Sequence, residues 1–160
     1  MARTQLEMEF IADHRKLTKG FQSVIDAVER NDPADMKSRA DELDRVAGPH
    51  IEFEEHVLYP TVTEDRGEDF GADLRREHQV ARSALLFIRK QDDQPLAAAD
   101  RARVLEQLRV GLEHAVACGS LLSHLTVSDD KKQKKMLNTL EEYRQQDLRW
   151  TDLDAQSIAQ

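Results

Sequence analysis

The sequence predicts an all-α fold, an up-down antiparallel four-helix bundle with one additional helix at its C-terminal end. Three observations lead to this prediction. Apolar residues recur at spacings of three and four along most of the chain, no segment alternates for long enough to form a strand, and the stretches between the helical patterns are short. Because short connections bring successive helices back alongside one another, neighbours are expected to run antiparallel.

The bulk composition suits a single soluble domain. The 160 residues are 39% hydrophobic and 34% charged, and six glycines and four prolines leave few helix breakers. The net charge of −8 argues against nucleic acid as a partner, because phosphate binding needs a cationic face. No stretch approaches the roughly 18 to 20 apolar residues that cross a bilayer, and the first residues lack the apolar middle of a secretion signal. We therefore expect a cytoplasmic protein that binds neither nucleic acid nor membrane.

The first half of the chain contains two helical patterns. The stripe of the first consists of Leu6, Phe10, His14, Leu17, Phe21, Val24 and Val28. It ends at the breaker Asn31-Asp32-Pro33, where the proline suits the first turn of the second helix. A kink or short break is expected near Pro49, because proline removes one helical hydrogen bond. The second helix approaches its end at Tyr59-Pro60, before a turn at Asp65-Arg66-Gly67.

The second half contains three helical patterns. The stripe of the third helix consists of Phe70, Leu74, His78, Ala81, Leu85 and Ile88. The stripe of the fourth runs through Val104, Leu108, Gly111, His114, Cys118, Leu121 and Leu125. Ser128 is a candidate N-cap for a fifth helix. The expected domain organisation is a bundle over residues 1–127, a helix over 128–150 that packs on the bundle or extends from it, and a flexible tail over 151–160.

An internal repeat relates the two helical pairs. Adding 64 to a position in about 6–60 gives the equivalent position in 70–124, so that His14 corresponds to His78 and His50 to His114. The acid before the first histidine also recurs, as Asp13 and then as Glu77. One helical hairpin used twice implies a bundle with pseudo-two-fold symmetry.

The four histidines of this repeat are candidate metal ligands. A single histidine on an apolar stripe is usually a core residue with satisfied nitrogens, but one on each of four helices favours a shared partner. A metal satisfies several buried imidazoles at once. Glu54 lies four residues after His50 on the same helix face and is the candidate carboxylate ligand. Mixed imidazole and carboxylate ligation favours iron, manganese or zinc.

The other polar residues near these positions are weaker candidates for metal ligands. Glu55 lies about 100° further round the helix than Glu54, so it either faces solvent or supports a ligand. Glu77 is a further candidate ligand or supporting acid. His56 points off the ligand stripe, and His124 lies about 15 Å along the helix axis from His114, so neither is expected to bind the same metal.

The stretch from His50 to Pro60, HIEFEEHVLYP, resembles the HxxxEExxLYP signature of the hemerythrin, or HHE cation-binding, family. Asp13-His14 and Glu77-His78 are similar to the histidine positions of that family's first and third helices, and the resemblance covers about residues 6 to 125. It implies a four-helix bundle with a non-haem, oxo-bridged di-iron centre. Members of the family are associated with binding oxygen, with responses to oxygen, nitric oxide or iron, and with repair of iron–sulfur centres.

The fourth helix departs from the family pattern. The family places its second bridging carboxylate at the position of Cys118 or one residue later, and here these residues are cysteine and glycine. Four arrangements remain open. Water or an exogenous ligand fills the gap in a di-iron site, a single metal binds, Cys118 itself ligates as a thiolate, or the site is empty and the bundle is structural. A small buried thiol is the favoured interpretation of Cys118.

The expected function is therefore a non-haem iron protein that binds or senses oxygen or nitric oxide, or handles iron. Its site is expected to hold two irons, and a mononuclear site with a single iron is the other possibility. The sequence has no obvious nucleophile–base pair or phosphate loop, so a binding protein is preferred to an enzyme. The alternatives are a peroxide-consuming or iron–sulfur-repair di-iron enzyme and a metal-free bundle that serves as an interaction module. The oligomeric state is open.

Overall fold

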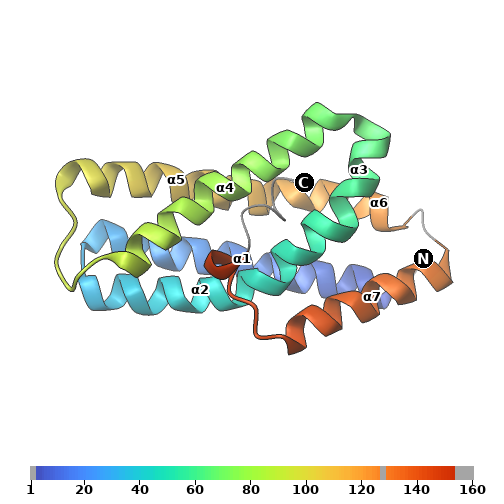
Figure 1. Ribbon diagram of the computed structural model, residues 1–160, viewed down its shortest axis with the longest axis horizontal. Helices are drawn as coiled ribbons and strands as arrows, with labels where there is room; N and C mark the ends of the chain where they lie inside the picture. The colour runs from blue at the N-terminus through green and yellow to red at the C-terminus, as the bar shows by residue number, and fades with distance from the viewer. Residues whose placement is uncertain (1–2, 127–128, 154–160) are drawn as a thin grey trace.

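The computed structural model describes residues 3–126 and 129–153. Four long helices form the bundle: α1 (Gln5–Arg30), α2 (Pro33–Phe53), α4 (Glu68–Lys90) and α5 (Ala98–Ala117). Helices α2 and α5 both pack against α1, and both also pack against α4, so the four helices form a closed ring around one core (Figure 1). The described residues contain no strand, and the predicted all-α bundle is confirmed.

The junction between the first two helices follows the predicted breaker. Asn31 adopts a left-handed backbone with φ of 55° and ends α1. Asp32 then caps α2 by accepting a hydrogen bond from the backbone N–H of Asp35, and Pro33 occupies the first turn. Because the connection is only two residues long, α2 folds back antiparallel to α1 and packs along it.

The second helix contains the expected irregularity, but it begins at Glu54, five residues after Pro49. Helix α2 continues through Pro49, and a π-helical turn, η1 (Glu54–Leu58), follows it. The backbone N–H of Tyr59 bonds to the carbonyl of Glu54, five residues back instead of four. Glu54 and Tyr59 are thereby stacked one turn apart, and both are buried. Helix α3 (Tyr59–Arg66) extends the path to Gly67, whose φ of 94° sets the turn into α4.

The fourth helix is also interrupted. Helix α5 ends at Ala117, and a 3₁₀ turn, η2 (Cys118–Leu121), leads into the short α6 (Leu122–Thr126). The two halves of the repeat therefore diverge in their backbones as well as in their side chains, with a wide turn after His50 and a tight turn after His114.

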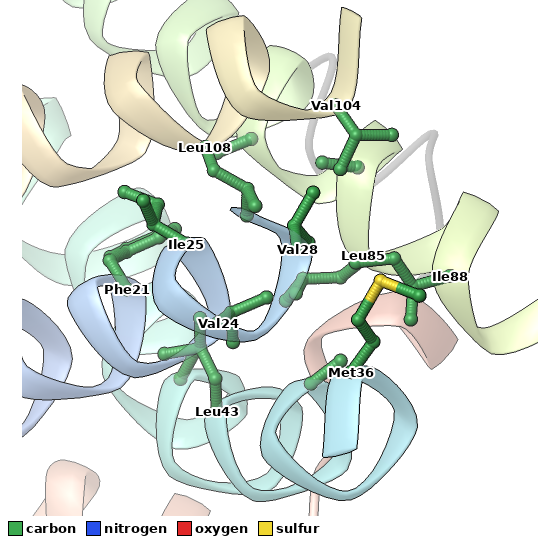
Figure 2. Packing of buried hydrophobic residues seen from close by; sticks show 14 of the residues in the cluster. Phe21, Val24, Ile25, Val28, Met36, Leu43, Leu85, Ile88, Val104 and Leu108 are labelled. Atoms are coloured by element: carbon green, nitrogen blue, oxygen red, sulfur yellow. The ribbon is translucent and has the colours of Figure 1, made fainter. Parts of the chain in front are cut away.

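Two hydrophobic clusters fill the bundle, one on either side of the histidines. The first includes Phe21, Val24, Leu43, Leu85 and Leu108, drawn from all four long helices (Figure 2). The second consists of Leu6, Phe10, Phe53, Leu58, Tyr59, Val62, Cys118, Leu121, Leu125, Met136 and Leu140. The polar site is thus enclosed by apolar packing at both ends, and the low dielectric there strengthens interactions between its charges.

The additional helix, α7 (Asp130–Gln145), packs on α1 and α2. The expected N-cap, Ser128, lies outside the described residues, and Asp129 caps the helix by accepting from the backbone N–H of Lys132. Met136 and Leu140 enter the second cluster, so α7 closes that end of the bundle. Arg144 donates hydrogen bonds to Glu9 at 2.7 Å and Asp13 at 2.9 Å, which joins α7 to α1.

The flexible tail expected over 151–160 does not begin at residue 151, because 151–153 pack on the bundle, and 154–160 lie outside the described residues. Residues Trp150–Asp152 form a 3₁₀ turn, η3, in which Trp150 and Thr151 are buried. The buried Asp44 carboxylate accepts from the backbone N–H of Thr151 at 2.8 Å and from its hydroxyl at 2.6 Å. Arg82 donates to the carbonyls of Trp150, Thr151 and Leu153. A polar composition suggests a frayed end, but here these polar groups are paired with residues about 70 to 110 positions earlier.

Candidate metal centre

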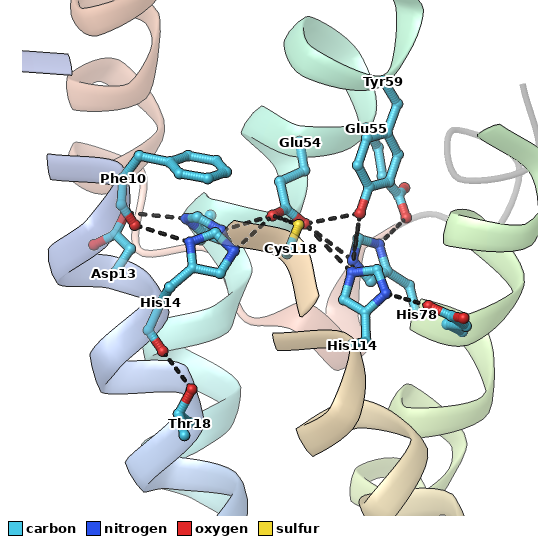
Figure 3. A network of polar contacts seen from close by, with 12 residues as sticks. Phe10, Asp13, His14, Thr18, Glu54, Glu55, Tyr59, His78, His114 and Cys118 are labelled. Atoms are coloured by element: carbon cyan, nitrogen blue, oxygen red, sulfur yellow. Dashed lines mark hydrogen bonds and ion pairs between the residues drawn. The ribbon is translucent and has the colours of Figure 1, made fainter. Parts of the chain in front are cut away.

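The structure brings the five predicted ligands together in the middle of the bundle. His14 comes from α1, His50 from α2, His78 from α4 and His114 from α5, and Glu54 lies between them at the start of the π turn (Figure 3). Glu54 and His50 are each only 1% exposed. The cluster is therefore shielded from solvent on most sides, and its groups must satisfy one another or share a cation.

One oxygen of Glu54 faces the first pair of helices. Its Oε1 atom lies 2.9 Å from Nε2 of His50 and 3.3 Å from Nε2 of His14. The thiol of Cys118 donates to the same oxygen at 3.2 Å. The expected buried thiol is confirmed in its burial, but it lies on the side of His14 and His50 instead of completing the half that contains His78 and His114.

The other oxygen of Glu54 faces the second pair. Its Oε2 atom lies 3.0 Å from Nε2 of His78 and 4.0 Å from Nε2 of His114. The hydroxyl of Tyr59 donates to this oxygen at 3.0 Å. Glu54 therefore stands between two pairs of imidazoles, with one carboxylate oxygen for each, which is the arrangement of a carboxylate that bridges two ions.

Each ring turns its other nitrogen away from the centre, onto an oxygen. Nδ1 of His50 contacts Asp13 at 3.1 Å, and Nδ1 of His78 contacts Glu55 at 2.8 Å. Nδ1 of His114 contacts Glu77, and Nδ1 of His14 donates to the carbonyl of Phe10 at 2.8 Å. These oxygens accept a hydrogen bond from Nδ1–H, so in its neutral form each ring presents the lone pair of Nε2 to the centre.

The supporting acids follow the internal repeat. Asp13 precedes His14 and holds His50, 37 positions later, and Glu77 precedes His78 and holds His114, also 37 positions later. Glu55, which the sequence left between a solvent-facing and a supporting role, is 4% exposed and supports His78. The matched acids were visible in the sequence, but their contacts with the histidine of the following helix were not predicted.

The charges of the site depend on one another. Burial by itself lowers the pKa of His50, but the nearby charge of Glu54 and hydrogen bonds to Asp13 and Glu54 outweigh it and raise the pKa to about 9. Burial likewise opposes charge on His78, and its hydrogen bonds to Glu54 and Glu55 raise its pKa. Burial favours the neutral form of Glu54, yet the His50 charge and the imidazole hydrogen bonds hold its pKa well below its usual value. In the metal-free cluster the proton on His50 and the charge of Glu54 therefore stabilise each other.

The donor set fits a metal. Nε2 lone pairs and carboxylate oxygens repel when they converge without a positive charge between them, and protons on His50 and His78 supply that charge in the metal-free protein. A cation would supply the same charge to all of the donors at once. Two groups of residues each offer donor atoms that all lie within 4.8 Å of one another. The first group is His14, Glu54 and Cys118, and the second is Glu54, His78 and His114. The role of these residues as ligands remains a prediction.

The remaining histidines lie apart from these two groups. His56 pairs with Glu52 at 3.2 Å on the outer side of the π turn, with 37% of its side chain exposed. His124 is buried on α6, and its closest ionic partner is Asp65 at 3.8 Å. Among the described residues neither joins a group of candidate ligands.

Two spaces adjoin the cluster. An open cleft of about 580 Å³ between α1 and α5 is lined by Phe10, His14, Ala115 and Val116, with the cations Arg3, Arg15 and Lys19 among its other lining residues. A void of about 10 Å³ lies inside, bordered by His14, His78 and His114. His14 and Ala115 line both spaces, so they form the wall between the cleft and the void.

The inner wall of the void includes Trp150 from the C-terminal segment. Its ring lies 6.2 Å from the His78 ring, measured between centroids. The indole N–H has no hydrogen-bond partner among the described residues, although the side chain is 1% exposed. An orphaned buried donor beside a void is a place for a small molecule with an acceptor atom.

The fold and this cluster define a helical-bundle protein with a buried set of candidate metal ligands contributed by every helix of the ring. A family model described as the hemerythrin HHE cation binding domain matches residues 9–125. The match spans well over half of the chain, and the protein therefore belongs to this family of cation-binding domains. Searches of curated proteins and of solved structures returned no significant match. No helix in the described ranges is both long and apolar enough to cross a membrane.

Proposed function

We propose that this chain is a non-haem iron protein that holds two irons and binds a small ligand, with oxygen and nitric oxide as the candidate ligands. The observation that carries the proposal is the two-sided environment of Glu54, which offers one oxygen to His14 and His50 and the other to His78 and His114. Mixed imidazole and carboxylate donors suit iron, and membership of a cation-binding family supports a metal at this place.

The proposed ligands divide into two half-sites that share Glu54. His14 and His50 hold one iron, and His78 and His114 hold the other. When bound, reduced iron with such ligands supplies a centre at which a small oxygen- or nitrogen-centred molecule can bind reversibly. A second bridging carboxylate would require an acidic residue at position 118, but this residue is a cysteine. The shorter side chain leaves room for an exogenous ligand beside His14.

The surrounding residues fix the orientation and charge of the imidazoles. Asp13, Glu55 and Glu77 each accept from an Nδ1–H, which fixes the tautomer and makes the opposite nitrogen a better donor. Arg144 on α7 holds Asp13 in turn. The additional helix therefore supports the first half-site through a chain of two contacts, from Arg144 to Asp13 to His50.

The spaces around the site favour a very small ligand. A void of about 10 Å³ is about the size of one water-sized probe, which suits a diatomic molecule and excludes an organic substrate. Most of its remaining lining is apolar, including Leu17, Phe21 and Ile51, so it provides little that would orient a polar substrate. The cleft outside His14 brings the surface of the protein close to the centre, separated from the void by His14 and Ala115.

The test is anaerobic reconstitution with ferrous iron, followed by metal analysis and by exposure to oxygen or nitric oxide. The proposal predicts two irons per chain and a visible spectrum that changes with the gas and returns when the gas is removed. The Glu54→Gln variant should lose at least one iron, whereas the control His56→Gln, altered outside the cluster, should retain both.

Other outcomes separate the alternatives. One iron per chain in the wild-type protein would point to a mononuclear site. Sustained consumption of peroxide by the loaded protein would favour an enzyme. No bound iron, with thermal stability unchanged by the metal, would contradict the proposal and favour a metal-free interaction module.

A further inference from the structure

Tyr59 is a buried residue of the cluster that the internal repeat does not explain. Its equivalent 64 positions later is Ser123, which is exposed. The Tyr59 side chain is fully buried, and its hydroxyl oxygen lies 3.0 Å from Oε2 of Glu54. The same oxygen lies 3.0 Å from Nε2 of His78 and 3.1 Å from Nε2 of His114. One phenolic oxygen therefore stands at the point where the donors of the second half-site converge (Figure 3).

The groups around the Tyr59 hydroxyl include more hydrogen-bond acceptors than donors. A phenol carries one proton, and Tyr59 donates it to Glu54. Glu55 and Glu77 accept from Nδ1 of His78 and His114, so in the neutral rings each Nε2 is an acceptor as well. While both rings are neutral, four acceptor atoms face one another with one proton among them, and a second proton held on His78 in the metal-free protein offsets only part of this mismatch. A cation placed among them satisfies all four.

The backbone and the neighbouring rings hold the phenol in this position. The π turn places Tyr59 one turn above Glu54, through the bond from its N–H to the Glu54 carbonyl. Its ring stacks on His78, with centroids 5.3 Å apart and an interplanar angle of 26°. The Arg75 guanidinium lies 5.8 Å from the ring centroid, on the ring face. The oxygen is therefore aimed at the centre by a rigid shell instead of reaching it on a mobile side chain.

We propose that Tyr59 is a metal ligand, supplying the oxygen donor of the half-site formed by His78, His114 and Oε2 of Glu54. This inference rests on the proposed iron centre and adds a residue to it. Ligation replaces the phenolic O–H bond with an O–metal bond, and the proton leaves to solvent. The phenolate then provides the additional anionic oxygen that the cysteine at position 118 does not.

The two half-sites consequently differ in chemistry. Around one oxygen of Glu54 lie two imidazoles and the Cys118 thiol, and around the other lie two imidazoles and a phenol. A phenolate is a hard, anionic donor, so it would favour ferric over ferrous iron in the half-site of His78 and His114. His14 and His50, next to the cleft, would hold a metal without this donor.

Resonance Raman spectroscopy of the air-oxidised, iron-loaded protein tests this inference. The chain has two tyrosines, Tyr59 and Tyr143, so Tyr143→Phe is the matched control. Wild type and Tyr143→Phe should show a phenolate-to-ferric charge-transfer band and enhanced tyrosinate ring modes. Tyr59→Phe should lose both and bind about half as much iron. Circular dichroism of each variant checks that the bundle is folded.

The outcomes separate this inference from the function on which it rests. Iron-loaded wild type without tyrosinate modes would overturn the role of Tyr59 and leave the iron centre standing, and this result does not depend on the folding of any variant. Retention of the modes in Tyr59→Phe would overturn it as well. Failure of the wild-type protein to bind any iron would overturn both.

Discussion

Raising the pH of the metal-free protein from 6.5 to 9 should remove a stabilising charge from the centre of the bundle. The pKa of His50 rises from its ordinary value of 6.5 to about 9, because the charges and hydrogen bonds of Glu54 and Asp13 outweigh its burial. A folded-state pKa above the unfolded value stabilises the protein fully below pH 6.5, and this stabilisation is lost as the pH rises through 9.

The size of the effect follows from the same values. One pKa unit corresponds to about 1.4 kcal/mol, so the rise from 6.5 to about 9 corresponds to about 3 kcal/mol of unfolding free energy. The pKa of His78 is raised too and adds in the same direction. Glu54, with its pKa held well below 4.5, stays ionised across this range and adds no slope.

Urea unfolding of chelator-treated protein between pH 6 and 9.5 measures this loss. With a slope of about 2 kcal/mol per molar urea, the unfolding midpoint should fall by about 1.5 M across the range. His50→Gln should show a smaller fall, limited to the contribution of His78, and the control His56→Gln should behave as wild type. A midpoint that stays constant from pH 6.5 to 9 would refute the coupling between His50 and the two carboxylates.

Three further predictions concern the metal and the C-terminal segment. Iron affinity should rise with pH over the same range, because iron must displace the proton on His50. A competition titration with a chelator measures the affinity, and an affinity that does not change with pH would contradict this prediction. Cys118→Glu should raise iron occupancy by adding a carboxylate beside Glu54, and metal analysis showing unchanged or lower occupancy would contradict the role given to that position. Gly48→Ala should lower stability by about 1–3 kcal/mol, because the new Cβ would lie 1.9 Å from the Leu148 carbonyl oxygen and displace the segment that carries Trp150. Thermal unfolding and a red shift in tryptophan fluorescence test that displacement, and a wild-type unfolding temperature would disprove the close contact.

The sequence predicted the residues whose position depends only on helical periodicity. His14, His78 and His114 recur on apolar stripes with the spacing of an α-helix, and the 64-residue repeat indicated that they face a common interior. Glu54 is the first residue of the π turn, and the regular helix before it keeps Glu54 on the same face as His50, so its position was also predicted. The end of the first helix at Asn31 followed from the strong local preferences of an Asn-Asp-Pro breaker.

What the sequence did not predict depends on departures from that periodicity. Counted at 100° per residue, Tyr59 falls away from Glu54, and only the i to i+5 bond of the π turn brings the two together. The proline at position 49 suggested an irregularity, but the helix absorbed the loss of one hydrogen bond there. The docking of Thr151 on Asp44 joins residues 107 positions apart, and no local pattern encodes it.

We expect Glu54 to lie between two irons, and anomalous diffraction at the iron absorption edge, from crystals of the iron-loaded protein, tests this placement. It predicts two anomalous peaks, one beside Nε2 of His14 and His50 and one beside Nε2 of His78 and His114, with an oxygen of Glu54 directed at each. A single peak, no peak, or iron bound away from Glu54 would contradict it.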